Sequence, residues 1–64
     1  MKTGDRVQLI SVPDYAKDDL NKFGIVVKVK DNTPHGRNVD VVLDEDKGIS
    51  AVFDHQLKII ERRN

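Results

Sequence analysis

The feature that most constrains the fold of this chain is a set of five short runs in which apolar residues alternate with other residues. The runs are Val7/Leu9, Ile25/Val27/Val29, Val39/Val41/Leu43, Ile49/Ala51/Phe53 and Leu57/Ile59. A period of two places alternate side chains on opposite faces of a β-strand. We therefore expect these apolar residues to face one core, and the residues between them to face outward: Arg6, Gln8, Lys28, Lys30, Asp40 and Ser50.

The chain is short, which limits what can hold it together. Sixty-four residues suffice for one domain with one core, and the absence of cysteine excludes a disulfide framework or a Cys-based zinc site. The core must be aliphatic, since only Phe23, Phe53 and Tyr15 are aromatic. We expect a single domain over residues 1–64, with its core within residues 4–60 and a polar tail at 61–64. Closing the sheet into a barrel would protect the edges of such Val-rich strands.

Charge and hydropathy limit the partners and the location of the protein. Eleven Lys and Arg balance eleven Asp and Glu, so no overall field attracts nucleic acid or anionic lipid. Any electrostatic recognition therefore has to be local. No stretch approaches the ~20 apolar residues of a membrane span, and the first ten residues lack the pattern of a signal peptide. We expect a cytoplasmic protein.

The segments between the runs define the predicted order of elements. A long first loop at 11–22 contains Pro13-Asp14 and one irregular helical turn, and a loop at 31–36 is rich in turn formers. A hairpin connection is predicted at 45–48, and Asp54 is placed to cap a 3₁₀ turn at 54–56. Gly24 begins the second strand, where a missing side chain suits close backbone approach. We predict an all-β fold, a five-stranded SH3-like barrel with a 3₁₀ turn before the last strand.

Several short motifs carry a resemblance to known barrels. They are Gly4-Asp5-x-Val7, Pro13-Asp14-Tyr15, Gly24-Ile25-Val26, Val39-x-Val41-x-Leu43-Asp44, and Gly48-Ile49 with Phe53 and Leu57. In these motifs the chain resembles the group of small SH3-like barrels to which a peripheral stromal protein of photosystem I belongs. Similar patterns occur in the beta chain of nitrile hydratase, in the plasmid-borne trimethoprim-resistant reductase and in KOW-type domains. The resemblance implies the fold more strongly than the role.

The chain departs from these families at positions that matter for function. Val42 stands where the photosystem protein has an arginine that would face an acidic electron carrier. The strand at 49–53 lacks the glutamine and tyrosine with which the reductase binds its cofactor and substrate. Neither activity therefore carries over to this chain.

Tyr15 is the most informative single residue for binding. It follows Pro13-Asp14 in the first loop, where its planar, amphipathic ring would either anchor a protein partner or cover one end of the core. Without Trp, the chain lacks the aromatic groove with which conventional SH3 domains bind proline-rich peptides. We predict a protein-binding site that comprises residues of both loops: Tyr15, Asp14, Pro34, His35 and Arg37. The leading hypothesis is a non-enzymatic accessory or adaptor domain that binds a protein partner.

Two surfaces offer alternatives. A basic patch of Lys28, Lys30 and Arg37 would serve a KOW-like module that binds nucleic acid or the ribosomal or transcription apparatus. An outward apolar set would mark a protein contact or self-association, or would instead pack beneath the first loop. Its predicted members are Val26, Val42, Val52 and Ile60.

The sequence contains no pattern that predicts catalysis. His35 and His55 are twenty residues apart, and with Asp14 or Asp54 they lack the local spacing of a metal site. The carboxylates at 18–19 and 44–46 fall in loops, and no glycine-rich phosphate loop or nucleophile motif is present. We expect no enzymatic activity, no metal and no cofactor.

Overall fold

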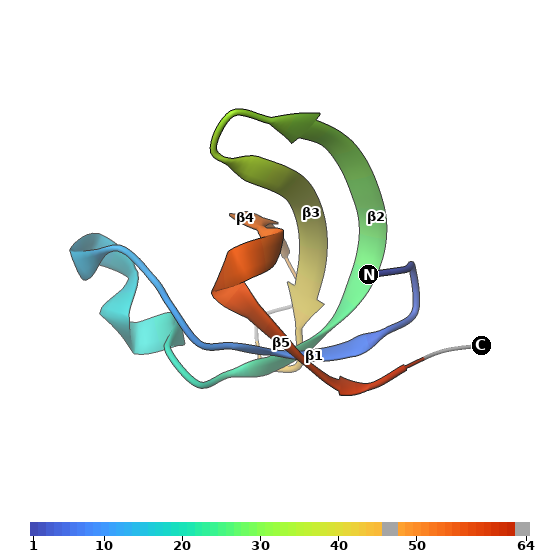
Figure 1. Ribbon diagram of the computed structural model, residues 1–64. Coiled ribbons are helices and arrows are strands. Elements are labelled where there is room, and N and C mark those ends of the chain that lie inside the picture. Colours follow the sequence, from blue (N-terminus) through green and yellow to red (C-terminus); the bar gives the residue numbers. More distant parts are fainter. Residues whose placement is uncertain (46–47, 63–64) are drawn as a thin grey trace.

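The computed structural model describes residues 1–45 and 48–62, and its fold is a curved, five-stranded antiparallel sheet (Figure 1). The elements are β1 (Arg6–Leu9), η1 (Asp14–Asp19), β2 (Phe23–Thr33), β3 (Gly36–Leu43), β4 (Ile49–Phe53), η2 (Asp54–Gln56) and β5 (Leu57–Glu61), where η denotes a 3₁₀ helix. The predicted all-β fold of five strands with a 3₁₀ turn before the last strand is confirmed. In the described part of the chain, no helix is both long and apolar enough to cross a membrane.

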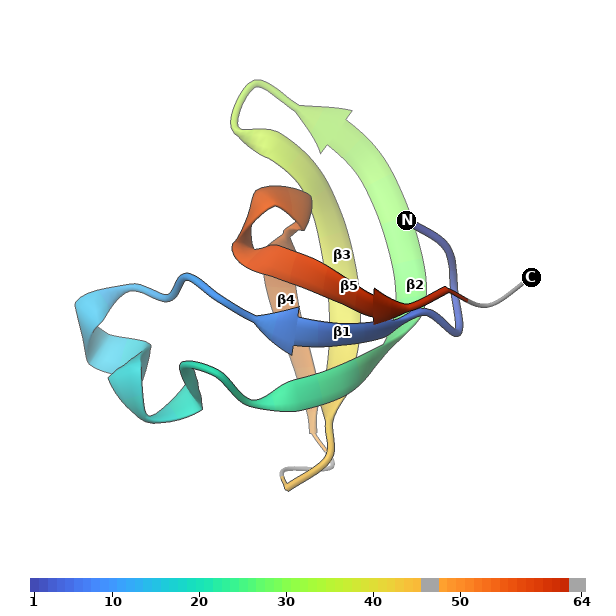
Figure 2. The same cartoon turned by 60° about the horizontal axis from the view of Figure 1, so that its bottom comes forward.

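The barrel is open, contrary to the predicted closure. The strand order is β4-β3-β2-β1-β5, so β4 and β5 lie at opposite edges of the sheet. The short η2 carries the chain from β4 across to β1, where β5 pairs, instead of back onto β4. Figure 2 shows β5 beside β1, with β4 behind them. Closure therefore does not protect the edge of β4.

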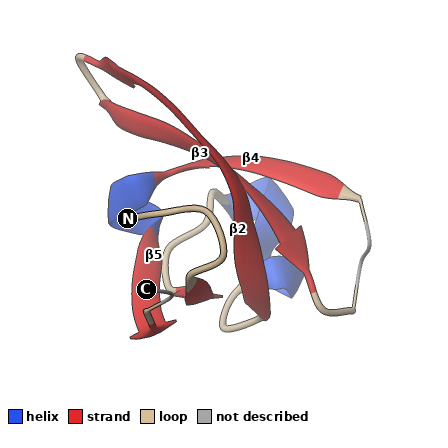
Figure 3. Ribbon diagram, turned by 90° about the vertical axis from the view of Figure 1, so that its right-hand side faces the viewer, coloured by secondary structure: helices blue, strands red, loops and turns tan. Residues whose placement is uncertain are grey.

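The long strand β2 belongs to both halves of the sheet. Its first residues pair with β1, and the longer remainder pairs with β3 to form the hairpin that projects in Figure 3. At Gly24 an added Cβ would lie 2.7 Å from Cγ1 of Val41 and 2.7 Å from the carbonyl oxygen of Val42. The predicted close backbone approach at Gly24 is confirmed, because only a glycine fits between these atoms.

The buried core is aliphatic, as predicted. Its seven side chains are Val7, Leu9, Val26, Val39, Val41, Leu43 and Leu57, with Met1, Val12, Val29, Val52 and Ile59 packed against them. Burying one such side chain contributes roughly 1.5–3 kcal/mol. A core this small makes each contribution a substantial part of the total stability.

The predicted inward face of β2 is wrong at the start of the strand. Val26 is fully buried, whereas Ile25 is 42% exposed and Val27 is 40% exposed. Val26 pairs with the buried Val41 of β3, and directly opposed residues share a face. Three consecutive apolar residues carry no alternation, so the sequence could not fix which of them points inward.

Farther along β2, the side chains that point to the core change from one alternate set to the other. The pairing with β3 shifts register between Val26 and Lys28, and again between Val29 and Asn32. A bulge of this kind turns the following side chains to the other face. Val29 consequently packs against the core, as predicted, while Lys28 and Lys30 remain exposed.

The predicted inward face of β4 is also wrong. Ile49 is 68% exposed and Ala51 is exposed, whereas Val52 packs against the core. Ser50, predicted to face outward, lies opposite the buried Val41 and therefore shares the core face. The cause is the register with β3, which no pattern within residues 49–53 reveals.

The connections follow the prediction with adjusted bounds. The first loop contains η1, which is kinked at Ala16, and η2 occupies the predicted residues 54–56. The loop predicted at 31–36 is shorter, because β2 and β3 extend to leave only Pro34 and His35 between them. β3 and β4 pair as the predicted hairpin, while residues 46 and 47 of its connection and residues 63 and 64 of the predicted tail lie outside the described residues.

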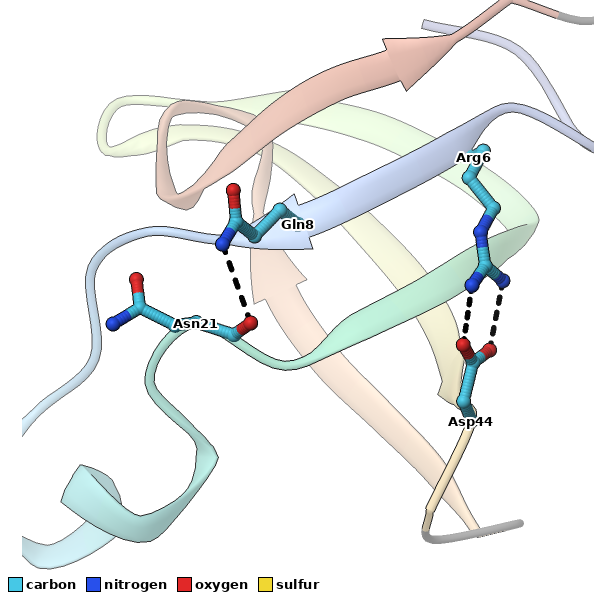
Figure 4. A network of polar contacts seen from close by, with 4 residues as sticks. All are labelled: Arg6, Gln8, Asn21 and Asp44. Atoms are coloured by element: carbon cyan, nitrogen blue, oxygen red, sulfur yellow. Dashed lines mark hydrogen bonds and ion pairs between the residues drawn. The ribbon is translucent and has the colours of Figure 1, made fainter.

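Polar contacts hold β1 to its surroundings (Figure 4). Arg6 forms a two-pronged ion pair with Asp44 just beyond β3, with Nη1 donating to Oδ1 at 2.8 Å and Nη2 to Oδ2. The Arg6 guanidinium also lies 5.9 Å from the centre of the Phe23 ring. Nε2 of Gln8 donates to the carbonyl oxygen of Asn21 at 3.3 Å, at the base of the first loop.

Candidate functional site

Tyr15 does not cover the core. It lies on η1, which Figure 1 shows projecting away from the sheet, and it is 93% exposed. The interpretation of Tyr15 as a lid is therefore wrong. The ring lies in solvent on a short 3₁₀ helix. It remains available to a partner, because binding it requires no contact within the protein to break.

A groove of about 730 Å³ lies between the first loop and the edge strand β4. Its lining residues come from the first loop, from β4, from η2, and from β1 and β3: Ser11, Val12, Pro13, Tyr15, Ala16 and Asp19; Ser50, Ala51, Val52 and Phe53; His55 and Gln56; and Leu9 and Asn38. A volume of this size is within the range of binding sites, roughly 300–1,000 Å³. Most of the lining is apolar or uncharged.

Gln56 ties the two walls of this groove together. Its side-chain oxygen accepts a hydrogen bond from the backbone N–H of Phe53 at 2.8 Å, and its Nε2 donates to the carbonyl oxygen of Ser11 at 3.1 Å. The backbone N–H of Ile10 also donates to the carbonyl oxygen of Gln56 at 2.8 Å. One residue of η2 thus fixes the start of the first loop relative to the end of β4, and with it the width of the groove.

The two histidines meet beside the groove. Nε2 of His55 lies 3.0 Å from the carbonyl oxygen of His35, and since a carbonyl only accepts, this ring nitrogen carries the proton. The His55 ring stacks on Phe53 with centroids 5.6 Å apart, and the His35 ring lies 6.4 Å from Phe53. These contacts join the β2–β3 turn to η2, because Gly36 leaves no side chain between them.

Asp54 and Arg37 contribute to the same junction. Oδ1 of Asp54 accepts hydrogen bonds from the backbone N–H groups of His55 at 2.8 Å and of Arg37 at 3.3 Å. The prediction that Asp54 caps the 3₁₀ turn is wrong in position, because the N-cap of η2 is Phe53 and Asp54 is the first residue of the turn. A side chain at Gly36 would lie 3.0 Å from Oδ1 of Asp54 and 3.0 Å from the His55 ring, and its φ of +127° also favours glycine.

The predicted protein-binding residues fall into two groups. Tyr15 lines the groove, and Asp14 is next to it on η1 with a fully solvated carboxylate 3.8 Å from the Lys17 ammonium. Pro34, His35 and Arg37 lie at the β2–β3 turn, and of these His35 reaches toward the groove through Phe53. Of the five predicted residues, the structure therefore places only Tyr15 in the lining of the groove.

The predicted basic patch is partly compensated by acidic charge. Nζ of Lys30 lies 3.2 Å from Oδ1 of Asp40, whose side chain is only 13% exposed. Lys28 is exposed and pairs in the sheet with Asp40. Asp40 therefore offsets positive charge on this face, which weakens its attraction for phosphate.

The exposed apolar patch differs in its members from the predicted one. Val26 and Val52 face the core, whereas Ile25, Val42 and Ile49 form a row across β2, β3 and β4 on the outer face. A shallow hollow of about 400 Å³ beside this row is lined by Ile25, Val27, Val42, Leu43 and Asp44. Ile60, predicted to face outward, is 46% exposed on β5, away from this row.

The sequence reasoning missed the contribution of β4 and Gln56 to the groove. Ala51 was expected in the core and Gln56 merely in a 3₁₀ turn, whereas both line the groove. One signal was present: residues 49–53 include no charge and no proline, which is unusual for an edge strand. That signal has meaning only once β4 is known to be an edge.

No metal site accompanies the groove in the described part of the chain. Among residues 1–45 and 48–62, no group of three or more His, Asp or Glu side chains is arranged to hold a metal ion. A scan against models of protein families, and searches of curated proteins and of solved structures, found no match to this chain.

Proposed function

We propose that this chain is a non-enzymatic accessory domain that binds a protein partner in the groove between the first loop and β4. The observation that carries the proposal is Tyr15, a large aromatic side chain that is 93% exposed at the wall of that groove. Tyrosine supplies a large contact area at low cost in conformational entropy, and it is enriched among the residues that dominate binding energy. A solvated tyrosine beside a mostly uncharged groove is typical of a binding anchor.

Three titratable or amide side chains of the groove, Asp19, His55 and Gln56, are engaged in contacts within the fold. Asp19 forms an ion pair with Lys22 at 3.1 Å, and Gln56 bonds to Phe53 and Ser11. The His55 ring donates to the carbonyl oxygen of His35. Each of these groups already has a structural partner, whereas a general acid or base must be able to reach a substrate proton.

A capture experiment tests this proposal. Tagged wild-type protein and the Tyr15→Ala variant would be incubated with host lysate, with and without nuclease, and the retained proteins quantified by mass spectrometry. We expect a discrete partner that survives nuclease and whose affinity falls at least about tenfold in Tyr15→Ala, the loss typical of an aromatic anchor. Because Tyr15 is almost fully solvated, the variant should keep the wild-type melting temperature.

The matched control is Ile60→Ala, which shortens an exposed apolar side chain on β5, outside the groove. This control should retain the partner at the wild-type level. Equal retention by Tyr15→Ala and wild type would contradict the proposal. Partners that disappear with nuclease would instead favour the nucleic-acid hypothesis and direct mutagenesis to Lys28, Lys30 and Arg37.

A further inference from the structure

The edge of β4 is unusually open to pairing. β4 pairs with β3 along Ile49–Phe53 without a register shift, and within the described chain no other strand lies beside it. Natural edge strands commonly carry charged residues, proline or bulges that oppose pairing with other chains. The other edge strand, β5, carries Lys58 and Glu61, whereas β4 carries no charge.

The hydrogen bond of Phe53 indicates which backbone groups point away from β3. The N–H of Phe53 donates to the Gln56 side chain, so it is not directed at β3. In an antiparallel pair, residues with outward and inward backbone groups alternate along the strand. Ala51, two residues earlier, therefore directs its N–H and C=O away from β3 as well. Ala51 also lines the groove, so these two groups are available to a chain that lies in it.

The shape of the groove favours a single extended segment. Its lining includes Ser50 and Val52 from the core face of β4 and Ala51 from the opposite face, so the groove follows the strand edge. The first loop forms the facing wall, and Gln56 fixes its distance from β4. A second copy of this chain would bring its own β3 along with β4, and so needs more room beside the edge than one strand does. A single strand carries no such neighbour.

The charges of the first loop select the chemistry of that segment. Residues 11–22 of the first loop contain three Asp and two Lys, a formal charge of −1, and Lys22 pairs with Asp19, whereas β4 is uncharged. The carboxylate of Asp14 is fully solvated, and Asp18 is exposed. A bound segment that carries Lys or Arg next to this loop would meet complementary charge. Alternating small apolar residues of the same segment would lie on the face of the sheet to which Val52 belongs.

We infer that the partner binds as an added β-strand: a basic, extended segment that pairs with the free edge of β4 through the backbone N–H and C=O of Ala51. This mode uses main-chain hydrogen bonds for affinity and alternate side chains for specificity. The inference rests on the proposed function and specifies the kind of partner. It assigns the binding contacts to β4 as well as to Tyr15.

Hydrogen exchange in the free protein tests which backbone N–H groups of β4 point away from β3. We expect the amide of Ala51 to exchange much faster than the amides of Ser50 and Val52, which point toward β3. An Ala51 amide protected as strongly as its two neighbours would overturn the inference. This measurement needs no partner and reports directly on the groups that the added strand would use.

Binding of a defined probe tests the segment. The probe is the capped peptide Lys-Val-Thr-Val-Thr-Val-Lys, and its matched control replaces both lysines with glutamate. We expect the basic peptide to bind at millimolar concentration or below, to slow exchange at Ala51, and to bind at least about fivefold more tightly than the acidic one. Absence of binding, or equal binding of the two peptides, would overturn the inference. Concentration-dependent protection of Ala51 without peptide would overturn it too, because the edge would then belong to a second copy.

Two substitutions of Ala51 separate the contribution of its backbone N–H to binding from that of its side chain. Ala51→Pro removes the outward N–H without removing a bond to β3, and Ala51→Val enlarges the side chain but keeps the N–H. We expect Ala51→Pro to weaken peptide binding at least tenfold and Ala51→Val to bind nearly as wild type, with both variants folded. If Ala51→Pro does not fold, the fixed φ of proline is a sufficient cause, and the exchange rate of the Ala51 amide in the wild-type protein then decides whether that N–H points away from β3.

The outcomes at Ala51 and Tyr15 distinguish this inference from the proposed function. Loss of the captured partner in Tyr15→Ala but not in Ala51→Pro would leave groove binding intact and reject strand addition. If both variants retain both the partner and the peptide, the proposal that the groove is the binding site is wrong. Loss in both variants, with Ile60→Ala unaffected, is the result that we expect.

Discussion

Arg6 and Asp44 are a pair of surface side chains in which each shifts the pKa of the other. The two-pronged hydrogen bond from Arg6 lowers the pKa of Asp44 below its ordinary value of 3.8, and the Asp44 carboxylate raises the pKa of Arg6. Both side chains remain partly exposed, so water and salt screen the pair. Its main structural role is to link β1 to the end of β3.

The pair predicts a specific dependence of stability on pH. Because the pKa of Asp44 is lower in the folded state, its stabilising contribution is fully present above the unfolded value near 3.8 and is lost as pH falls through the lower folded value. We expect Asp44→Asn to be less stable than wild type at pH 5–7, and the difference to shrink as the pH falls below about 4. Chemical denaturation over this range measures it.

Asp18→Asn is the matched control for this measurement. It also removes one negative charge, but from an exposed side chain of the first loop. A difference between Asp44→Asn and wild type that stays constant as the pH falls below about 4 would show that the ion pair does not stabilise the fold.

Individual residues also mark what the sequence can and cannot predict. The close approach at Gly24 was predictable, since a glycine at the start of an apolar strand has few other uses. The exposure of Tyr15 was not, because the same sequence permits a ring that folds over the core or one that stays in solvent. The choice depends on the path of η1, which tertiary contacts at its base determine.

At the scale of elements, the order of strands and turns was predictable and the inward faces of two strands were not. In β3 the charged Asp40 lies between Val39 and Val41 and marks the outward face, so the inward positions of Val39, Val41 and Leu43 could be derived despite Val42. In β2 and β4 the apolar residues run consecutively, and the register with β3 decides the face. A bulge in β2 then changes, partway along the strand, which alternate residues face the core. Neither register nor bulge leaves a signal within the strand itself.

A pair of substitutions in β2 tests this assignment of faces. Val26→Ala removes methyl groups from a fully buried position and should destabilise the protein by about 2 kcal/mol. Ile25→Ala removes more carbon atoms from a side chain that is 42% exposed, and should cost under about 1 kcal/mol. Urea denaturation of both variants measures the free energies of unfolding. A larger loss in Ile25→Ala than in Val26→Ala would restore the strict alternation and contradict the described register.

At the scale of the whole molecule, an open barrel accounts for the site. The period of two predicted a small all-β barrel, but it could not predict that β4 and β5 remain apart. That separation places the edge of β4 opposite the first loop, with η2 between them. The groove is therefore a property of the strand order, and its residues lie too far apart in sequence to form a motif. A domain of this size has a small core and therefore a small free energy of unfolding. A partner that binds along β4 only in the folded state would increase that free energy.

Site-specific photo-cross-linking tests the central claim, that the groove beside Tyr15 binds a protein partner. A benzophenone amino acid would replace Tyr15 in one protein and Ile60 in another, and each protein would be irradiated in nuclease-treated host lysate. We expect one discrete cross-linked protein from position 15 and none from position 60, because Tyr15 lines the groove and Ile60 does not. Equal cross-linking from both positions, or a specific product from position 60 alone, would contradict the claim.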